Sequence, residues 1–197
     1  LMGFEDDIFK ITPEAININD TRALRATQLV RDALRNMGRI VAASQIALLG
    51  VSYREDVGDT RYSGSEIIVR KLAEMGAEIA VNDPYVKHWW EIEKQDTYPA
   101  PGHSWARFFR NQESLNDMRM QSDIAGALKG VDAVILAVPD DAIASLAAAI
   151  EPSEAVLIHL SGAKTLDVLA PHDRRASVHP LVSLPDATVG AGRLRDG

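Results

Sequence analysis

Five short apolar runs, separated by segments with helical patterns, constrain the fold of this chain more than any other feature. The runs are continuous rather than alternating between apolar and polar residues, which is typical of strands buried on both faces of a parallel sheet. Strands that alternate with helices along a chain form βαβ units and a doubly wound sheet. The sequence therefore predicts a three-layer, Rossmann-like α/β fold with a parallel sheet of about five strands in the order 3-2-1-4-5. The predicted strands are residues 45–50, 78–82, 132–138, 155–160 and 176–179.

Helical patterns fill the gaps between these runs. The clearest begins at Ser63-Gly64-Ser65-Glu66 and ends at Gly76. Ser63 and Glu66 form a capping box, in which each side chain bonds the other residue's backbone N–H. Ahead of the first strand, a long helix is predicted over 13–37, with Gly38 as its stop. Shorter helices are predicted over 122–129 from Ser122, over 140–150 from Asp140 or Asp141, and over 164–170.

Two segments interrupt this rhythm and define the expected domain organisation. Residues 84–121 form a long insertion that holds all three tryptophans of the chain. Aromatic density of this kind favours packing, against the sheet or against a second subunit. The last residues have no apolar period, and we expect them to be irregular. The expected parts are an N-terminal helical segment, 1–40, a Rossmann-like domain, 41–181, which contains the insertion, and a tail, 182–197.

The composition argues against several classes of function. A net charge of −7 is unfavourable for binding nucleic acid or an anionic membrane as the main partner. The absence of cysteine excludes disulfides, thiolate metal sites and a cysteine nucleophile, and it suits the cytoplasm, which is the expected location. No apolar run reaches the roughly 18 residues of a membrane span, and the start, LMGFEDDIFK, lacks the order of a signal peptide.

Ligands of doubly wound sheets bind at the carboxyl ends of the strands, which places the candidate site residues in the loops after the runs. Asp83 follows the second run, and two roles stay open for it. A carboxylate in this place accepts hydrogen bonds from the hydroxyls of a ribose, whereas Asn82-Asp83-Pro84 is also a common turn-forming sequence. The loops after the third and fourth runs contribute Pro139, Asp140, Ser161 and Gly162.

The loop after the first run, GVSYREDVGDTRYSGSE over 50–66, carries charged side chains where a dinucleotide-binding sheet has its glycine-rich turn. Without G-x-G-x-x-G, a backbone cradle for a pyrophosphate is not expected here. Arg54 and Arg61 offer guanidinium donors to phosphate oxygens instead. The alternative is that these two arginines pair locally with Glu55, Asp56 and Asp59.

The histidines do not indicate a metal or a catalytic centre. His159 lies within an apolar run and His179 ends one, and such isolated histidines are usually hydrogen-bonded structural residues. No pair has metal-ligand spacing, and Ser161 lacks the G-x-S-x-G sequence of a nucleophile elbow. We therefore expect no metal and assign no catalytic residue.

The loop and the second run together resemble the C-terminal domain of the UDP-glucose/GDP-mannose dehydrogenase family. Members carry a strand, a segment like G-hydrophobic-x-[YF]-K-x-D-x-x-D-T-R-x-S, a helix, and a strand that ends in D-P-Y or D-P-x-V. The resemblance covers roughly residues 13–137, in which 87–121 resembles the insertion of one nucleotide-sugar dehydrogenase subgroup. The matching residues are Gly50, Tyr53, Asp56, Asp59, Thr60, Arg61 and Ser63, followed by Asp83-Pro84-Tyr85-Val86.

This resemblance implies a role for the domain. Members of the family use NAD to oxidise a nucleotide-sugar alcohol to a uronate, and this domain holds the UDP end of the substrate. Arg54 stands where the family has a substrate-contacting lysine, and it keeps the charge but not the shape. Arg61 matches an arginine that reaches the cofactor across the domain cleft. Ile18-Asn19-Asp20 resembles the end of the family's long central helix, which implies a homodimer.

Two features of the family are missing from these 197 residues: the NAD domain with its G-x-G-x-x-G, and the catalytic cysteine. Without a cysteine the thiohemiacetal route to a uronate is closed. We therefore expect that this chain does not catalyse the reaction by itself.

A second resemblance begins at about residue 132. AVPDDAI, HLSGA and VHPL resemble the Rossmann-like NADP-binding domain of oxidoreductases related to ketopantoate reductase and prephenate dehydrogenase. That resemblance implies that Pro139, Asp140, Ser161 and Gly162 face the cofactor. The chain is thus similar to a mosaic of two half-sheets.

The sequence as a whole favours the nucleotide-binding domain of a nucleotide-sugar dehydrogenase. Its partner would be a small nucleotide or nucleotide sugar. NAD or NADP is the cofactor of the parent families, and whether this chain itself binds either one stays open. Two alternatives stay open: a recombined Rossmann-like scaffold without a ligand, and an NAD(P)-dependent oxidoreductase domain. The nucleotide-binding residues in the favoured reading are Gly50, Tyr53, Arg54, Asp59, Arg61 and Asp83.

Overall fold

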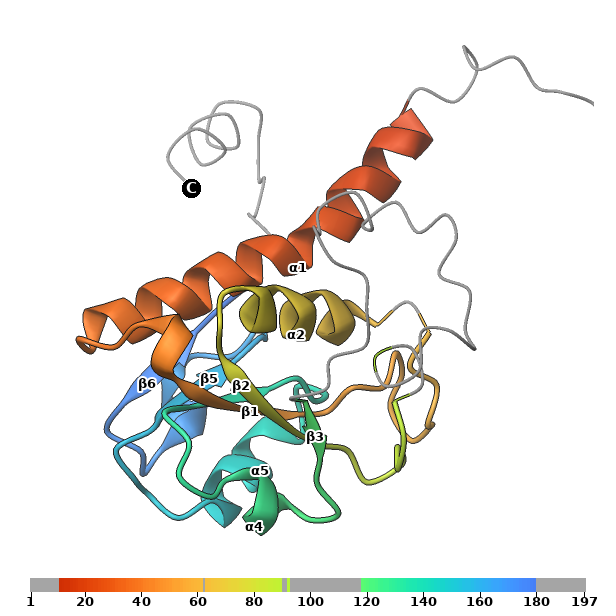
Figure 1. Cartoon of the computed structure of the whole chain (residues 1–197). Coiled ribbons are helices and arrows are strands. Elements are labelled where there is room, and N and C mark those ends of the chain that lie inside the picture. The colour runs from red at the N-terminus through yellow and green to blue at the C-terminus, as the bar shows by residue number, and fades with distance from the viewer. Residues whose placement is uncertain (1–10, 62, 90–91, 93–117, 180–197) are drawn as a thin grey trace, which may run out of the picture.

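A parallel sheet forms the centre of the chain in the computed structural model, which describes residues 11–61, 63–89, 92 and 118–179 (Figure 1). Its strands lie in the order β3-β2-β1-β4-β5-β6, and each neighbouring pair is parallel. The predicted class, a Rossmann-like α/β sheet, is therefore confirmed. The strands are β1 (Gln45–Leu49), β2 (Glu78–Asn82), β3 (Arg119–Met120), β4 (Ala133–Leu136), β5 (Val156–His159) and β6 (Arg175–Ser177).

The predicted strand order is wrong in one respect. It takes residues 132–138 as the third strand, which would place them beyond the second. In the structure they contain β4, which pairs with β1. The third strand is β3, at the far side of β2. Two residues, one of them a charged arginine, form no apolar run, and this is why the pattern shows five strands and the structure six.

Helices cover both faces of the sheet (Figure 1). α1 and α2 lie on one face, and α4 and α5 lie on the other. A single 3-10 turn precedes β1 and another follows β5. The helices are α1 (Ile11–Asn36), α2 (Gly64–Glu74), α4 (Ile124–Ala127) and α5 (Ile143–Ala149), and the 3-10 turns are η1 (Val41–Ala43) and η3 (Leu166–Leu169).

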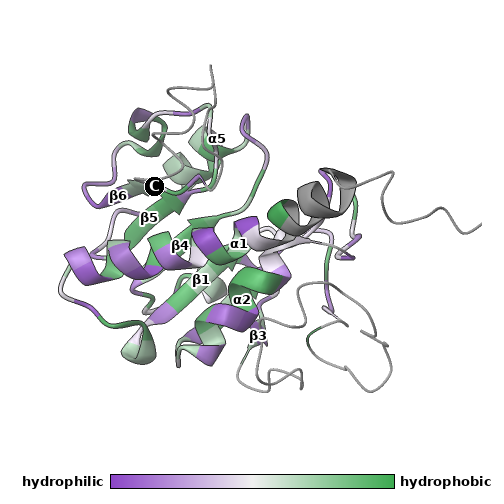
Figure 2. Ribbon diagram, turned by 90° about the horizontal axis from the view of Figure 1, so that it is seen from above, coloured by the Kyte–Doolittle hydropathy of each residue, from purple (hydrophilic) through white to green (hydrophobic). Residues whose placement is uncertain are grey.

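The sheet has an apolar core on each side, because side chains of a strand point alternately to its two faces. Ile46 and Leu48 of β1 belong to the core shared with α1 and α2. Ala47 and Leu49 belong to the core shared with α4 and α5. Figure 2 shows the result: the central strands are mainly hydrophobic, whereas α1 and α2 carry both hydrophilic and hydrophobic residues.

Helix α1 corresponds to the predicted helix over 13–37. Val30 and Leu34 of its apolar stripe are fully buried, and Gly38 follows its end with a φ of +73°. None of the helices in the described ranges is both long and apolar enough to cross a membrane.

Two predicted helices begin at other residues than expected, and a third predicted helix is a 3-10 turn in the structure. α5 begins at Ile143 with Ala142 as its N-cap, so Asp140 and Asp141 stay in the loop after β4. α4 is capped by Asp123 instead of Ser122. Within residues 164–170, only the 3-10 turn η3 forms.

The start of α2 differs from the predicted capping box. Ser63 caps the helix, but its hydroxyl oxygen accepts the backbone N–H of Ser65 at 3.2 Å. The carboxylate of Glu66 accepts the Nε–H of Arg70 at 2.9 Å, and their side chains are only 6% and 2% exposed. A buried ion pair therefore joins two successive turns of the helix that packs against α1.

Only the ends of the insertion over 84–121 lie within the described residues. Trp89 and Ile92 are fully buried in the core shared with α1 and α2, in agreement with a packing role for this part. The other two tryptophans, residues 1–10 and the expected tail, 182–197, lie outside the described residues. The division of the chain into three parts stays a prediction.

Glu66→Ala is expected to lower the free energy of unfolding by about 3–5 kcal/mol, because it leaves the buried guanidinium of Arg70 without this carboxylate. Urea denaturation followed by circular dichroism measures the loss. Glu74→Ala is the matched control, since Glu74 forms a more exposed pair with Lys71 on the same helix. It should cost only about 0.3–0.5 kcal/mol, and equal losses in the two variants would contradict the expectation.

Candidate functional site

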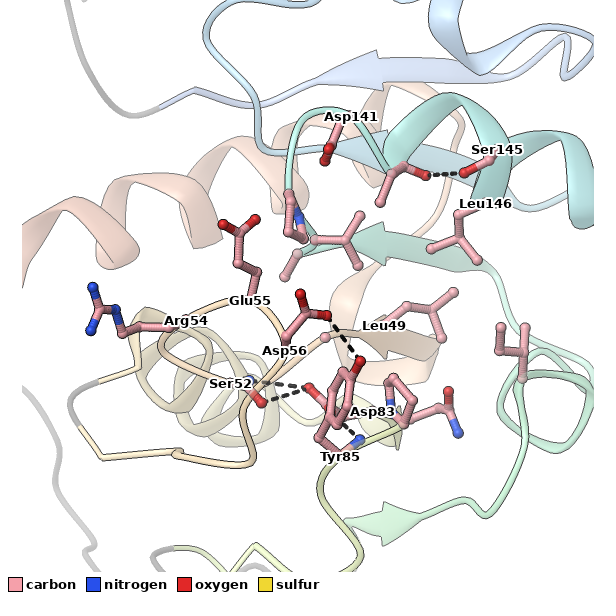
Figure 3. A pocket seen from close by; sticks show the side chains of 18 of the residues that line it. Leu49, Ser52, Arg54, Glu55, Asp56, Asp83, Tyr85, Asp141, Ser145 and Leu146 are labelled. Atoms are coloured by element: carbon pink, nitrogen blue, oxygen red, sulfur yellow. Dashed lines mark hydrogen bonds between the residues drawn. The ribbon is translucent and has the colours of Figure 1, made fainter.

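A cavity of about 860 Å³ opens at the carboxyl edge of the sheet (Figure 3). Residues from three loops line it: Gly50 and 52–56 after β1, 83–85 after β2 and 137–139 after β4. Asp141, Ser145 and Leu146, at and before the first turns of α5, also line it. Because β2 and β4 pair with opposite edges of β1, the cavity lies where the strand order reverses. Doubly wound sheets bind their ligands at this place.

Gly50 brings the loops after β1 and β4 together. Its φ is +97°, in the region that favours glycine. A Cβ at this position would lie 2.2 Å from the carbonyl oxygen of Ala137. The backbone therefore passes Ala137 at a distance that only glycine permits, and this contact fixes one wall of the cavity.

Asp83 joins the loop after β1 to the end of β2. One oxygen of its carboxylate accepts the backbone N–H groups of Val51 at 2.8 Å and Ser52 at 3.1 Å, and also the Ser52 hydroxyl at 3.1 Å. The other oxygen accepts the backbone N–H of Tyr85 at 2.9 Å. The bond to Tyr85 corresponds to the turn-forming alternative for Asp83. The bonds to Val51 and Ser52 add a clamp between two loops, and the residue is only 8% exposed.

The loop beyond Ser52 folds back on itself and is held against Tyr85. The backbone N–H of Tyr53 donates to the carbonyl of Asp59 at 2.7 Å. The Tyr85 hydroxyl donates to the carboxylate of Asp56 at 2.9 Å, and this bond raises the pKa of Tyr85 above its ordinary value. Gly58 passes so close that a Cβ would lie 2.6 Å from the Tyr85 carbonyl oxygen. The loop therefore has a defined shape at the mouth of the cavity.

Arg61 forms a local ion pair, which was the alternative to a phosphate contact. Its guanidinium donates from Nε and one terminal nitrogen to the two carboxylate oxygens of Asp59, at 2.9 and 2.7 Å. These bonds lower the pKa of Asp59 from 3.8 to about 2. Within the described part of the chain, neither residue lines the cavity.

Arg54 lines the cavity, together with Gly50, Tyr53 and Asp83 of the predicted nucleotide-binding residues. It is the one cationic side chain among the described residues that do so, against the carboxylates of Glu55, Asp56, Asp83 and Asp141. In Figure 3 its side chain extends away from Asp56 and Tyr85. The site thus combines an acidic wall with a single guanidinium at its edge.

Only one of the four residues expected to face a cofactor is among the described residues that line the cavity. Pro139 lines the cavity, but Asp140, Ser161 and Gly162 are not among its described lining residues. The Ser161 hydroxyl oxygen accepts the backbone N–H groups of Ala163 and Lys164, both at 3.1 Å. A Cβ on Gly162 would lie 2.5 Å from the ring of His179. Ser161 and Gly162 therefore stabilise the loop after β5.

His159 and His179 each form a hydrogen bond with the backbone. His159 is fully buried, and its Nδ1 accepts the backbone N–H of Ser161 at 3.2 Å. Burial lowers the pKa of His159 below its ordinary value, so that the neutral ring prevails. The Nδ1 of His179 bonds the carbonyl of Leu160 at 3.1 Å. In the described ranges, no group of three or more His, Asp or Glu side chains is arranged to hold a metal ion.

Several residues that line the cavity were not among the predicted nucleotide-binding residues. Asp141 was one of the two residues at which a helix was expected to start, and it lies in the loop before α5. Tyr85 belongs to the D-P-Y sequence after the second run, which was a signal for its position. Asp56 is a residue of the charged loop, but its bond to Tyr85 spans 29 residues and leaves no trace in local sequence.

The loop after β1 does not fit the pyrophosphate of NAD or NADP, the cofactors implied by the resemblance. In dinucleotide-binding sheets the backbone N–H groups of this loop bind phosphate oxygens. Here the N–H groups of Val51 and Ser52 already donate to Asp83. A second anion at the same place would also meet the negative charge of that carboxylate.

Comparison with known proteins identifies one family. The model of the UDP-glucose/GDP-mannose dehydrogenase family, UDP binding domain, matches residues 47–164. The match includes all three loops that line the cavity. It also continues beyond residue 132, where the second resemblance begins, and the mosaic origin stays a prediction.

Individual relatives cover only part of this chain. The UDP-glucose 6-dehydrogenase of Gallus gallus is 32% identical over 80 residues, which are 41% of this chain and 16% of that protein. The UDP-N-acetyl-D-mannosamine dehydrogenase of Methanococcus aeolicus is 27% identical over 78 residues, or 40% of this chain and 17% of that protein. The chain therefore matches only a small part of the length of these relatives.

A solved structure supports the fold. The NDP-N-acetyl-D-galactosaminuronic acid dehydrogenase from Methanosarcina mazei Go1 superimposes with a TM-score of 0.62 over 90% of this chain and 33% of that one. The two are 19% identical in sequence, so this likeness concerns the fold alone.

Gly50→Ala is expected to lower the free energy of unfolding by more than about 3 kcal/mol. The positive φ alone costs a non-glycine residue about 1–3 kcal/mol, and the contact with Ala137 adds to that cost. Gly38→Ala is the control, because Gly38 also has a positive φ but no atom lies within 4 Å of its added Cβ. Urea denaturation of both variants isolates the contact, and equal losses would argue against it.

Arg61→Ala is expected to return the pKa of Asp59 from about 2 toward 3.8. Because the pKa is lower in the folded state, the pair stabilises that state above pH 3.8 and the contribution disappears as the pH falls through about 2. Carboxyl-carbon NMR across this range measures the pKa, with Arg54→Ala as the control that leaves it unchanged. A value that stays near 2 in Arg61→Ala would assign the shift to another group.

Proposed function

Since the chain belongs to the UDP-glucose/GDP-mannose dehydrogenase family through its UDP-binding domain, we propose that it binds the UDP part of a nucleotide sugar in the cavity between β1 and β4. The observation that carries the proposal is the identity of the lining loop. Residues 50–56, which begin the family-like motif, contribute a large share of the cavity wall. A volume of about 860 Å³ is in the range of pockets that hold a ligand of this size.

The chemistry of the wall suits a ligand with both hydroxyl groups and phosphates. In this proposal the carboxylates of Glu55 and Asp56 accept hydrogen bonds from ribose or sugar hydroxyls. Arg54 donates to the phosphate oxygens from the edge of the cavity. The exposed rings of Tyr53 and Tyr85 offer faces for the uracil base.

The other predicted site residues act indirectly in this proposal. Gly50 and Asp83 shape the wall rather than contact the ligand. Arg61, paired with Asp59, holds the far end of the loop. Pro139 provides an apolar surface next to the ligand.

Oxidation of the nucleotide sugar is a property that we propose for a larger unit rather than for these residues alone. The matched region is 16% of the length of the Gallus gallus relative. NAD would then bind to residues other than the loop after β1, and the chain would hold the substrate without catalysing. A homodimer formed through α1 and a cytoplasmic location are parts of the same proposal.

Isothermal titration calorimetry with UDP, a UDP-sugar, NAD and NADP tests the proposal. Binding of UDP and the UDP-sugar is the expected result. Absence of binding for all four ligands would favour a scaffold without a ligand. Tight binding of NADP with turnover would favour an oxidoreductase domain instead.

Arg54→Ala is expected to weaken UDP binding by about 1.5–3 kcal/mol, which is the range for hydrogen bonds to charged groups. The matched control is Arg31→Ala, which removes an exposed arginine of α1 paired with Asp32 and should leave the affinity unchanged. Arg61→Ala separates the two predicted roles of that residue. A loss equal to that of Arg54→Ala would assign Arg61 to the ligand, and an unchanged affinity would assign it to Asp59.

A further inference from the structure

Three hydrogen-bond donors of the loop after β1 converge on one oxygen of Asp83. They are the backbone N–H groups of Val51 and Ser52 and the hydroxyl of Ser52. Consecutive backbone N–H groups of this kind form the concave anion sites in which proteins bind phosphate. The loop therefore has the donors of an anion site, and the anion that it binds belongs to the chain itself.

The first turn of α2 lies beside this arrangement. The Ser65 hydroxyl donates to the carbonyl oxygen of Gly50 at 3.3 Å, which brings the start of the helix to the end of β1. The positive end of the helix dipole favours a negative charge nearby. The loop that binds the carboxylate of Asp83 thus lies between the end of β1 and the start of α2, as the phosphate-binding loop of a dinucleotide-binding sheet does.

We propose that Asp83 determines the specificity of the cavity by occupying the phosphate position of the loop after β1, so that dinucleotides are excluded and the phosphates of any ligand bind elsewhere. Four donors hold its carboxylate, and the residue is 8% exposed, so it does not turn away without losing these bonds. Arg54 then remains as the phosphate-binding group among the described lining residues.

The other carboxylates of the cavity do not have this role. Asp141 lines the same cavity and is exposed, and it lies in the loop after β4. Its removal takes away one negative charge without releasing the N–H groups of Val51 and Ser52. Asp141→Ala is therefore a matched control that separates the charge of the cavity from the occupation of the loop.

The test is a titration of the ¹⁵N-labelled chain with inorganic pyrophosphate, followed at the N–H resonances of Val51 and Ser52. In Asp83→Ala, both resonances are expected to shift, with an affinity at least about tenfold higher than that of the unaltered chain, equivalent to about 1.4 kcal/mol. In Asp141→Ala the affinity should change much less. A folded Asp83→Ala chain without this gain, or an equal gain in Asp141→Ala, would overturn the proposal.

Asp83→Asn removes the negative charge of the side chain but leaves an oxygen that still occupies the N–H groups of the loop. Its amide oxygen still accepts the N–H groups of Val51 and Ser52, so no gain in pyrophosphate binding is expected, and a gain equal to that of Asp83→Ala would contradict the proposal. If Asp83→Ala does not fold, the unaltered chain decides, because Val51 and Ser52 resonances that shift with tight pyrophosphate binding would show that the loop is open to it and would overturn the proposal. The inference concerns the cavity of the proposed function, but it does not need UDP to bind: a failure of UDP binding would leave the result for pyrophosphate intact.

Discussion

The burial of β1 on both faces is the constraint on which this structure depends. Its side chains enter two separate cores, so helices must cover both faces, and its two edges need partner strands. β2 and β4 occupy those edges. After β2 the sheet continues with β3 on one side, and after β4 it continues with β5 on the other side. The loops after β1 and β4 therefore separate beyond Gly50, and the cavity is the space between them. The position of the site follows from the apolar sequence of one strand.

The polar groups at this edge are satisfied largely from within the protein. Buried N–H groups need an acceptor, and Asp83 provides one for the loop after β1 and one for Tyr85. Tyr85 in turn donates to Asp56. The loop consequently has its shape before any ligand arrives. A preformed cavity loses less conformational entropy on binding than a loop that must first become ordered.

The success of sequence reasoning depended on the range of the interaction. Continuous apolar runs predicted the fold class and the central strands, because a strand that is buried on both faces has apolar side chains at successive positions. The pair of Arg61 and Asp59 was one of two predicted alternatives because the residues are two positions apart. The clamp of Asp83 joins residues 32 and 31 positions apart, and β3 is a two-residue edge strand, so no local pattern indicates either. The Glu66–Arg70 pair was missed for a different reason, because a capping box competes for the same carboxylate.

The acidic wall of the cavity also affects how fast a ligand arrives. Glu55, Asp56 and Asp141 are exposed at a mouth where Arg54 is the single cation among the described lining residues. The net charge of the mouth therefore repels an anionic ligand during its approach, whereas the attraction of the guanidinium acts at short range. Dissolved salt screens this repulsion over about 8–10 Å at physiological concentrations. Encounter with such a mouth becomes faster as the ionic strength rises, the opposite of the behaviour of a basic nucleotide site.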